Sequence, residues 1–68
     1  MERTRAGDGR EVLIEIATIG AYAKVTAIDS ETGTEVSVMG PSNAPRASLQ
    51  AAALNKLEFV LNKKKSAG

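Results

Sequence analysis

Alternating apolar and polar residues, interrupted by short glycine-containing turns, restrict this chain to a small antiparallel sheet. Residues 11–19 are rich in valine and isoleucine and too few for a stable helix, so they predict a first strand. Gly20 and Ala21 follow as a two-residue loop, and Gly20 occupies the position where a type II′ hairpin needs a positive φ. Residues 22–29 are then expected to return as a second strand.

A second turn at residues 30–33, which ends in glycine, predicts a third strand over residues 34–39. With these two loops, Val25 lies opposite Ile16 on one side and Val38 on the other. A slip of one residue would move every side chain to the opposite face, so this pairing is a strong constraint. The inner face then collects only apolar residues: Val12, Ile14, Ile16, Ala23, Val25, Ala27, Val36 and Val38. The outer face is mixed: Leu13, Glu15, Ala17, Ile19, Tyr22, Lys24, Thr26, Ile28, Glu35, Ser37 and Met39.

One helix is predicted to follow the sheet. Gly40 and Pro41 are expected to end the third strand, because proline cannot donate to a ladder. Ser42 or Asn43 is expected to cap the helix, with Pro45 in its first turn. The helix carries an apolar stripe that should lie on the inner face of the sheet: Leu49, Ala53, Leu57, Val60 and Leu61.

The predicted fold class is α+β, a three-stranded antiparallel meander with one C-terminal helix packed on one face, in the order β-β-β-α. Residues 1–9 lack periodicity and are expected to form a disordered lead-in. Residues 10–62 are expected to form the single domain, and residues 63–68 a frayed basic tail. A chain this short buries only about 60% of its unfolded surface, so oligomerisation would help to stabilise it.

The composition excludes several classes of function. The chain contains no cysteine and no histidine, which removes disulfides, thiolate and imidazole metal ligands, and catalysis by these residues. Nine basic and eight acidic residues give a net charge of +1, far from the strongly basic character of a dedicated nucleic-acid binder. No apolar run approaches the ~20 residues of a membrane span. The lack of cysteine fits a reducing compartment, so we expect a cytoplasmic protein.

The remaining polar motifs favour structural roles, so we predict no catalytic, cofactor-binding or metal-binding residue. Glu15 and Glu35 share the outer face without the apolar pocket that prepares a carboxyl group for acid–base catalysis. Residues 29–33 lack the spacing of a calcium loop and instead predict a hairpin turn in which Asp29 bonds the backbone. Residues 40–43 lack a phosphate-loop motif and favour a helix cap.

The apolar residues of the outer face predict an interaction surface. Exposed apolar patches on a small domain often mark interfaces, and a symmetric dimer would cover them. The leading hypothesis is therefore a non-enzymatic protein-interaction module, either a homodimer or part of a larger complex. The alternative is a monomer with scattered exposed apolar side chains. The predicted contact residues are Leu13, Ile19, Tyr22, Ile28 and Met39, while Phe59 lies off the helix stripe.

A second hypothesis is weak nucleic-acid binding by basic residues near the two ends of the chain. Such binding would weaken steeply as salt increases. Tyr22 is the only aromatic residue in the strands, so the sheet lacks a platform on which bases could stack. The predicted contacts are Lys56, Lys63, Lys64 and Lys65, with Arg3, Arg5 and Arg10.

Several segments along the chain are distinctive: Arg10-Glu11-Val12, Tyr22-Ala23-Lys24-Val25-Thr26-Ala27-Ile28-Asp29, Thr32-Gly33-Thr34-Glu35-Val36, Gly40-Pro41 and Ala53-Leu54-Asn55-Lys56-Leu57. In these segments the chain resembles a family of short alphaproteobacterial proteins of unknown function with a β-β-β-α order. The resemblance implies a bacterial origin and supplies no activity.

A partial likeness covers only the back half, where three strands precede the helical segment at residues 49–57. This half resembles the end of a double-stranded-RNA-binding domain. That family has a first helix before its strands and a lysine-rich start to its final helix, and this chain has neither. The likeness therefore implies a shared architecture and does not carry the function.

Overall fold

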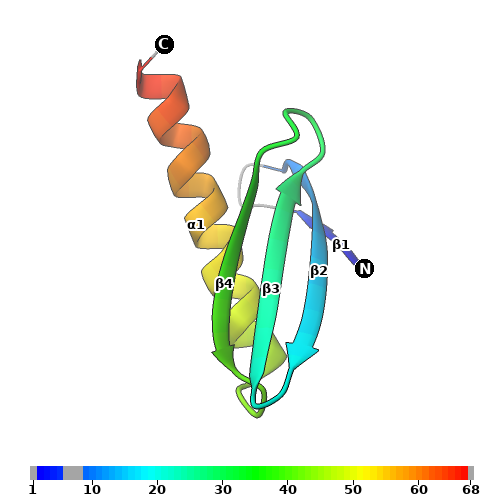
Figure 1. Ribbon diagram of the computed structural model, residues 1–68. Coiled ribbons are helices and arrows are strands. Elements are labelled where there is room, and N and C mark those ends of the chain that lie inside the picture. Colours follow the sequence, from blue (N-terminus) through cyan, green and yellow to red (C-terminus); the bar gives the residue numbers. More distant parts are fainter. Residues whose placement is uncertain (1, 6–8, 68) are drawn as a thin grey trace.

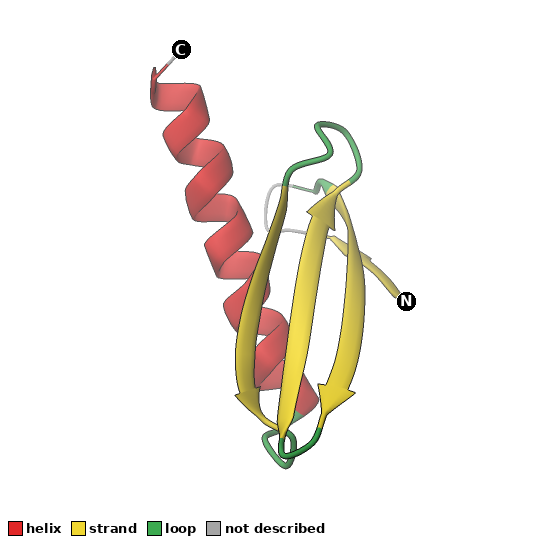
Figure 2. Ribbon diagram, viewed as in Figure 1, coloured by secondary structure: helices red, strands yellow, loops and turns green. Residues whose placement is uncertain are grey.

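The computed structural model describes residues 2–5 and 9–67, which form an antiparallel sheet and one long helix (Figure 1). The sheet order β1-β2-β3-β4 follows the sequence. The helix covers one face of the sheet and leaves the other open, as Figure 2 shows. The α+β class is confirmed, but the sheet has four strands instead of three. The elements are β1 (Glu2–Arg5), β2 (Glu11–Ile19), β3 (Tyr22–Asp29), β4 (Glu35–Pro41) and α1 (Arg46–Ala67).

The predicted pairing of the three long strands is confirmed. Ile16 on β2 lies opposite Val25 on β3, and Val25 lies opposite Val38 on β4. Gly20 has a φ of 59° and Gly33 a φ of 76°, so both turns use the positive φ that glycine adopts without strain. The two glycine turns and the apolar alternation therefore specify one register.

β4 extends to Pro41, opposite Tyr22, instead of ending at Met39. The backbone N–H of Asp29 donates to the carbonyl of Thr34 over 2.8 Å, so even-numbered residues of β4 turn their backbone groups towards β3. Odd-numbered residues turn theirs towards the free edge. Pro41 therefore continues the strand without the loss of a hydrogen bond to β3, because an N–H at this position would point away from β3.

The expectation of a disordered lead-in over residues 1–9 is wrong for β1, while residues 1 and 6–8 lie outside the described part. β1 pairs antiparallel with the start of β2, and Arg3 lies opposite Leu13. Any extended segment can pair its backbone with a strand edge, and this requires no apolar side-chain pattern. The absence of periodicity therefore gave no indication of this strand.

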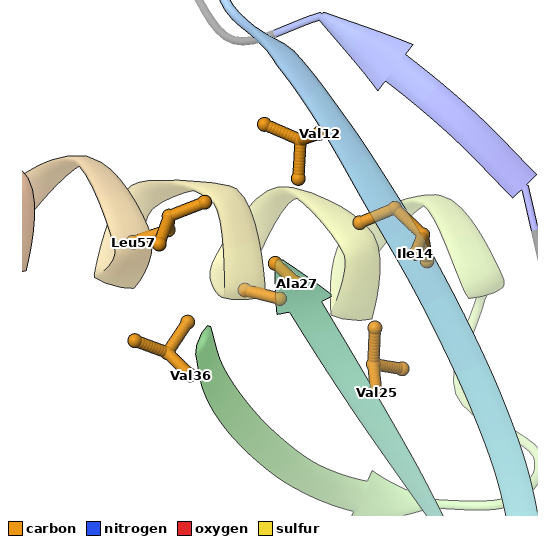
Figure 3. Close-up of a cluster of buried hydrophobic side chains, with 7 residues drawn as sticks. Val12, Ile14, Val25, Ala27, Val36 and Leu57 are labelled. Carbon is orange, nitrogen blue, oxygen red and sulfur yellow. The ribbon is translucent and has the colours of Figure 1, made fainter. Parts of the chain in front are cut away.

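The hydrophobic core lies between α1 and the inner face of the sheet, where α1 contacts β3 and β4 (Figure 3). Ala53 and Leu57 on the helix are completely buried, and Leu49, Val60 and Leu61 are packed against the core at its margin. The predicted apolar face and the predicted helix stripe are therefore confirmed as one cluster. Its buried members are Val12, Ile14, Val25, Ala27, Val36, Ala53 and Leu57.

The helix begins at Arg46, directly after Pro45, so Ser42 and Asn43 lie in the preceding turn and do not cap it. At its other end the helix continues through Ala67, although a frayed tail was expected from residue 63. At about 1.5 Å per residue, α1 is roughly 33 Å long, whereas β4 spans only about 24 Å. The last turns of α1 consequently extend past the sheet (Figure 1).

Gly40 allows the helix to approach β4 closely. A Cβ atom at this position would lie 2.5 Å from Cδ2 of Leu49, well inside van der Waals contact. A glycine that looks like a strand terminator in the sequence is therefore a packing residue within the strand.

Candidate interaction surface

The most exposed apolar residues of the sheet gather at one end of its outer face. Ile19 lies opposite Tyr22 on adjacent strands, and Met39 lies opposite Lys24 on the next pair. Ile19, Tyr22 and Met39 are 61%, 58% and 61% exposed, respectively. We call these three residues the outer-face patch. No described element covers them, because α1 packs on the opposite face.

Leu13 and Ile28 belong to the same face but are only half-buried rather than exposed. They lie opposite each other, and Leu13 has Arg3 of β1 on its other side. Ile19, in contrast, lies beyond the end of β1 and has a strand neighbour only at Tyr22. The structure thus places three of the five predicted contact residues together and sets the other two apart, at the opposite end of the face.

The middle of the outer face is polar. Glu15, Thr26 and Ser37 form one cross-strand row, in which the hydroxyl oxygens of Thr26 and Ser37 are 3.0 Å apart. Glu15 and Glu35 are both exposed, and β3 separates their strands. The row therefore does not bring two carboxylates together. A shallow hollow of about 350 Å³ lies beside the row, lined by Glu15, Ile16, Ala17, Lys24 and Thr26.

A buried carboxylate anchors the turn between β3 and β4. Asp29 is completely buried, and its Oδ2 accepts hydrogen bonds from the Thr32 hydroxyl at 2.6 Å and the Thr32 N–H at 3.0 Å. Arg10 pairs with the same oxygen at 3.1 Å and with Glu31 at 2.9 Å. Asp29 thus makes the predicted backbone bond and also ties the turn to the segment that precedes β2.

Burial disfavours the charged form of Asp29, but it is outweighed by other interactions. The hydrogen bonds from Thr32, with the positive charge and hydrogen bond of Arg10, hold the pKa of Asp29 below its ordinary value. Neither the burial of Asp29 nor its ion pair was predicted from the sequence. The alternation of side chains along β3 could have predicted the burial, because Asp29 lies two residues after Ala27 and four after Val25, on the same inner face.

Of the predicted cationic residues of the helix, the structure describes the side chains of Lys56 and Lys63. The Lys56 ammonium donates to the backbone carbonyl of Ser37 over 3.1 Å. Lys63 is exposed, and the side chains of Lys64 and Lys65 lie outside the described part. Phe59 is 67% exposed and shares a side of the helix with Lys56 and Lys63, at spacings of three and four residues.

Arg3 and Arg10 form ion pairs with acidic residues of the same chain. Arg3 lies 3.7 Å from the Glu11 carboxylate, and Arg10 is engaged by Asp29 and Glu31. The side chain of Arg5 lies outside the described part. Among the described residues, no group of three or more acidic side chains could hold a metal ion, and no helix could cross a membrane.

Residues 9–64 match a family described as a domain of unknown function, DUF6898. No curated protein matches the chain. No solved structure matches it either.

Proposed function

Because the chain belongs to this family of unknown function, we propose a role from its geometry: a small, cytoplasmic, non-enzymatic module that binds another protein through its outer-face patch. One observation carries the proposal. Three large apolar side chains on three consecutive strands are each about 60% exposed, while the helix already covers the other face of the sheet. Clustered apolar exposure of this kind is typical of protein interfaces.

The charge beside the patch indicates what the partner should offer. Lys24 is exposed between Ala17 and Met39, and none of the ion pairs described here involves it. A face-to-face homodimer centred on the patch would bring two Lys24 ammonium groups near each other, and like charges at an interface oppose association. A partner with apolar residues and an acidic group facing Lys24 fits better.

The test compares substitutions on two equally exposed surfaces. Tyr22→Ser and Met39→Ser remove apolar contacts from the patch, and Phe59→Ser is the matched control on the helix. We expect wild type and Phe59→Ser to capture the same protein from cell extracts, and each patch variant to bind it at least about tenfold more weakly. Equal capture by all three variants, or no specific capture by wild type, would contradict the proposal.

The same variants test a homodimer formed through the outer face. If the patch joins two copies, sedimentation of the wild-type protein will show a mass that rises with concentration. Tyr22→Ser will then remain monomeric at concentrations where Phe59→Ser dimerises.

A second candidate function, weak nucleic-acid binding, is favoured by Phe59 lying between Lys56 and Lys63 on the exposed side of α1. If this side binds phosphates, affinity for short RNA and DNA duplexes will fall steeply between low and moderate salt. Lys63→Gln will weaken binding and flatten that salt dependence, whereas Lys24→Gln on the outer face will not. Salt-insensitive binding, or equal affinity of the two variants, would rule this candidate out.

A further inference from the structure

β2 is paired on only part of the side that faces away from β3. Among the described residues, β1 pairs with β2 as far as Ile14, and residues 15–19 pair with β3 alone. Ser30 donates its backbone N–H to the carbonyl of Glu11, so odd-numbered residues of β2 face β3. Ile16 and Thr18 therefore direct their backbone N–H and carbonyl groups away from the sheet. No hydrogen bond within the described part of the chain reaches these groups.

The opposite edge of the sheet is protected at two positions. On β4, the outward carbonyl of Ser37 accepts the hydrogen bond from Lys56, and Pro41 has no N–H to offer. Lysine and proline at a strand edge are common devices against unwanted pairing. Residues 15–19 of β2 include no lysine and no proline. We call this segment the open edge of the sheet.

A small cavity lies on the inner face beside this open edge. It measures about 110 Å³. Its lining comes from the sheet, the turn after β4 and the first residues of α1: Ile16, Thr18, Ala23, Val25, Ser42, Ala44, Arg46 and Leu49. Cavities that bind metabolites are several times larger, at about 300–1,000 Å³. This cavity is too small for such a ligand.

We propose that a second copy of this chain adds its β2 antiparallel to this open edge, with Ala17 on the two-fold axis. Ile16 of each copy would then face Thr18 of the other. Residues 16 and 18 both turn their backbone groups outwards, so each of these two pairs exchanges two hydrogen bonds. The pairing begins at Glu15, just past Ile14, where the ladder with β1 ends.

The side chains of this segment are self-complementary, and this selects a second copy as the occupant. Ile16 lies on the inner face, where it packs against its own core and lines its own copy's cavity; in the pair it also faces Thr18 of the other copy, which lines that copy's cavity. Ala17 meets its own counterpart on the axis, where opposed Cα atoms approach to about 4.5 Å and a small side chain fits. Glu15 faces Ile19, so no like charges are opposed. The segment can therefore pair with its own copy, with a small residue on the axis and apolar and hydroxyl side chains facing each other on the inner side.

This pairing is independent of the proposed role of the outer-face patch. A two-fold axis perpendicular to the sheet joins the two sheets into one and places both outer faces on the same side. Ile19, Tyr22 and Met39 of both copies therefore stay available to another protein.

Amide hydrogen exchange of the unmodified protein, followed by NMR over a concentration series, tests the pairing. We expect the amides of Ile16 and Thr18 to exchange slowly in concentrated samples and rapidly on dilution. The amide of Ala17, bonded to β3, should be protected throughout, and the edge amide of Met39 should exchange rapidly throughout. Rapid exchange at Ile16 and Thr18 in a sample shown to be dimeric, or a monomer at every soluble concentration, would overturn the proposal.

Proline substitutions at the two edges of the sheet test whether self-association uses the β2 edge. Thr18→Pro removes an outward N–H without breaking the ladder with β3, and Glu35→Pro does the same on the β4 edge. Thr18→Pro should weaken self-association about tenfold or more, since two intermolecular hydrogen bonds are lost, and Glu35→Pro should leave it unchanged. If Thr18→Pro disturbs the fold, Ile16→Ala, which shortens a side chain that faces Thr18 of the other copy and also packs at the margin of its own core, should weaken self-association instead while circular dichroism shows the variant to be folded. Dimerisation that survives both of these variants but is lost in Tyr22→Ser would assign self-association to the outer face and reject the edge.

Discussion

Leu57→Ala will lower the free energy of unfolding by about 2–5 kcal/mol, the cost of removing a fully buried leucine side chain. Leu57 has no exposed surface and lies in the cluster between α1 and the sheet. A domain of this size has a total stability of only about 3–10 kcal/mol, so the variant should be largely unfolded or close to it. Urea denaturation followed by circular dichroism measures the loss.

Phe59→Ala is the matched control for that prediction, because Phe59 is on the same helix but is 67% exposed. Its effect should be within about 0.5 kcal/mol, as for most surface substitutions. A Leu57→Ala midpoint equal to that of Phe59→Ala would mean that α1 does not dock on the sheet as described.

Asp29→Ala will destabilise the protein by about 3 kcal/mol at neutral pH, because it removes the buried member of a partly buried ion pair and takes away the acceptor of the two Thr32 hydrogen bonds. Asp29 is completely buried, whereas Glu31, the other partner of Arg10, is exposed. Glu31→Gln is therefore the control, with an expected loss below about 1 kcal/mol. Denaturant midpoints of the two variants at neutral pH provide the comparison.

The contribution of Asp29 to the free energy of unfolding should decrease as the pH falls. The folded state holds the pKa of this carboxyl below its unfolded value, so its contribution is fully present above the unfolded pKa of about 3.9. The contribution is lost as the pH falls through the folded pKa. Between pH 5 and the acid limit, wild type should therefore lose more stability than Asp29→Ala. Equal losses in the two proteins would show that Asp29 is not held in its charged form.

Side-chain periodicity was sufficient to predict the three long strands, their pairing and the core. Gly20 fixed the first turn, and the alternation around Val25 left only one register in which the inner face was entirely apolar. The apolar stripe of the helix likewise indicated Ala53 and Leu57 as core residues. These features follow from the hydrophobic effect, which depends on the spacing of side chains along the chain.

The features that the sequence did not reveal depend on backbone or charged groups. β1 pairs through its backbone, so its side chains carry no pattern. Asp29 looks like an ordinary turn residue, and only the fold shows that Arg10 reaches it from another segment. The outer-face patch has three of the five predicted residues because Leu13 and Ile28 are half-buried, and Leu13 has Arg3 of β1 beside it. In each case the deciding contact joins segments whose proximity no local pattern encodes.

The order β1-β2-β3-β4 has a consequence for how quickly the chain reaches its native state. Every strand pairs with its neighbour in sequence, and the loop between β2 and β3 contains only two residues. Closing such short loops costs little conformational entropy, and proteins dominated by local contacts fold fastest. The sheet can therefore assemble one hairpin at a time, because each strand pairs with a strand that is next to it in the sequence. The time during which its open edge and apolar faces are exposed to other unfolded chains is correspondingly short.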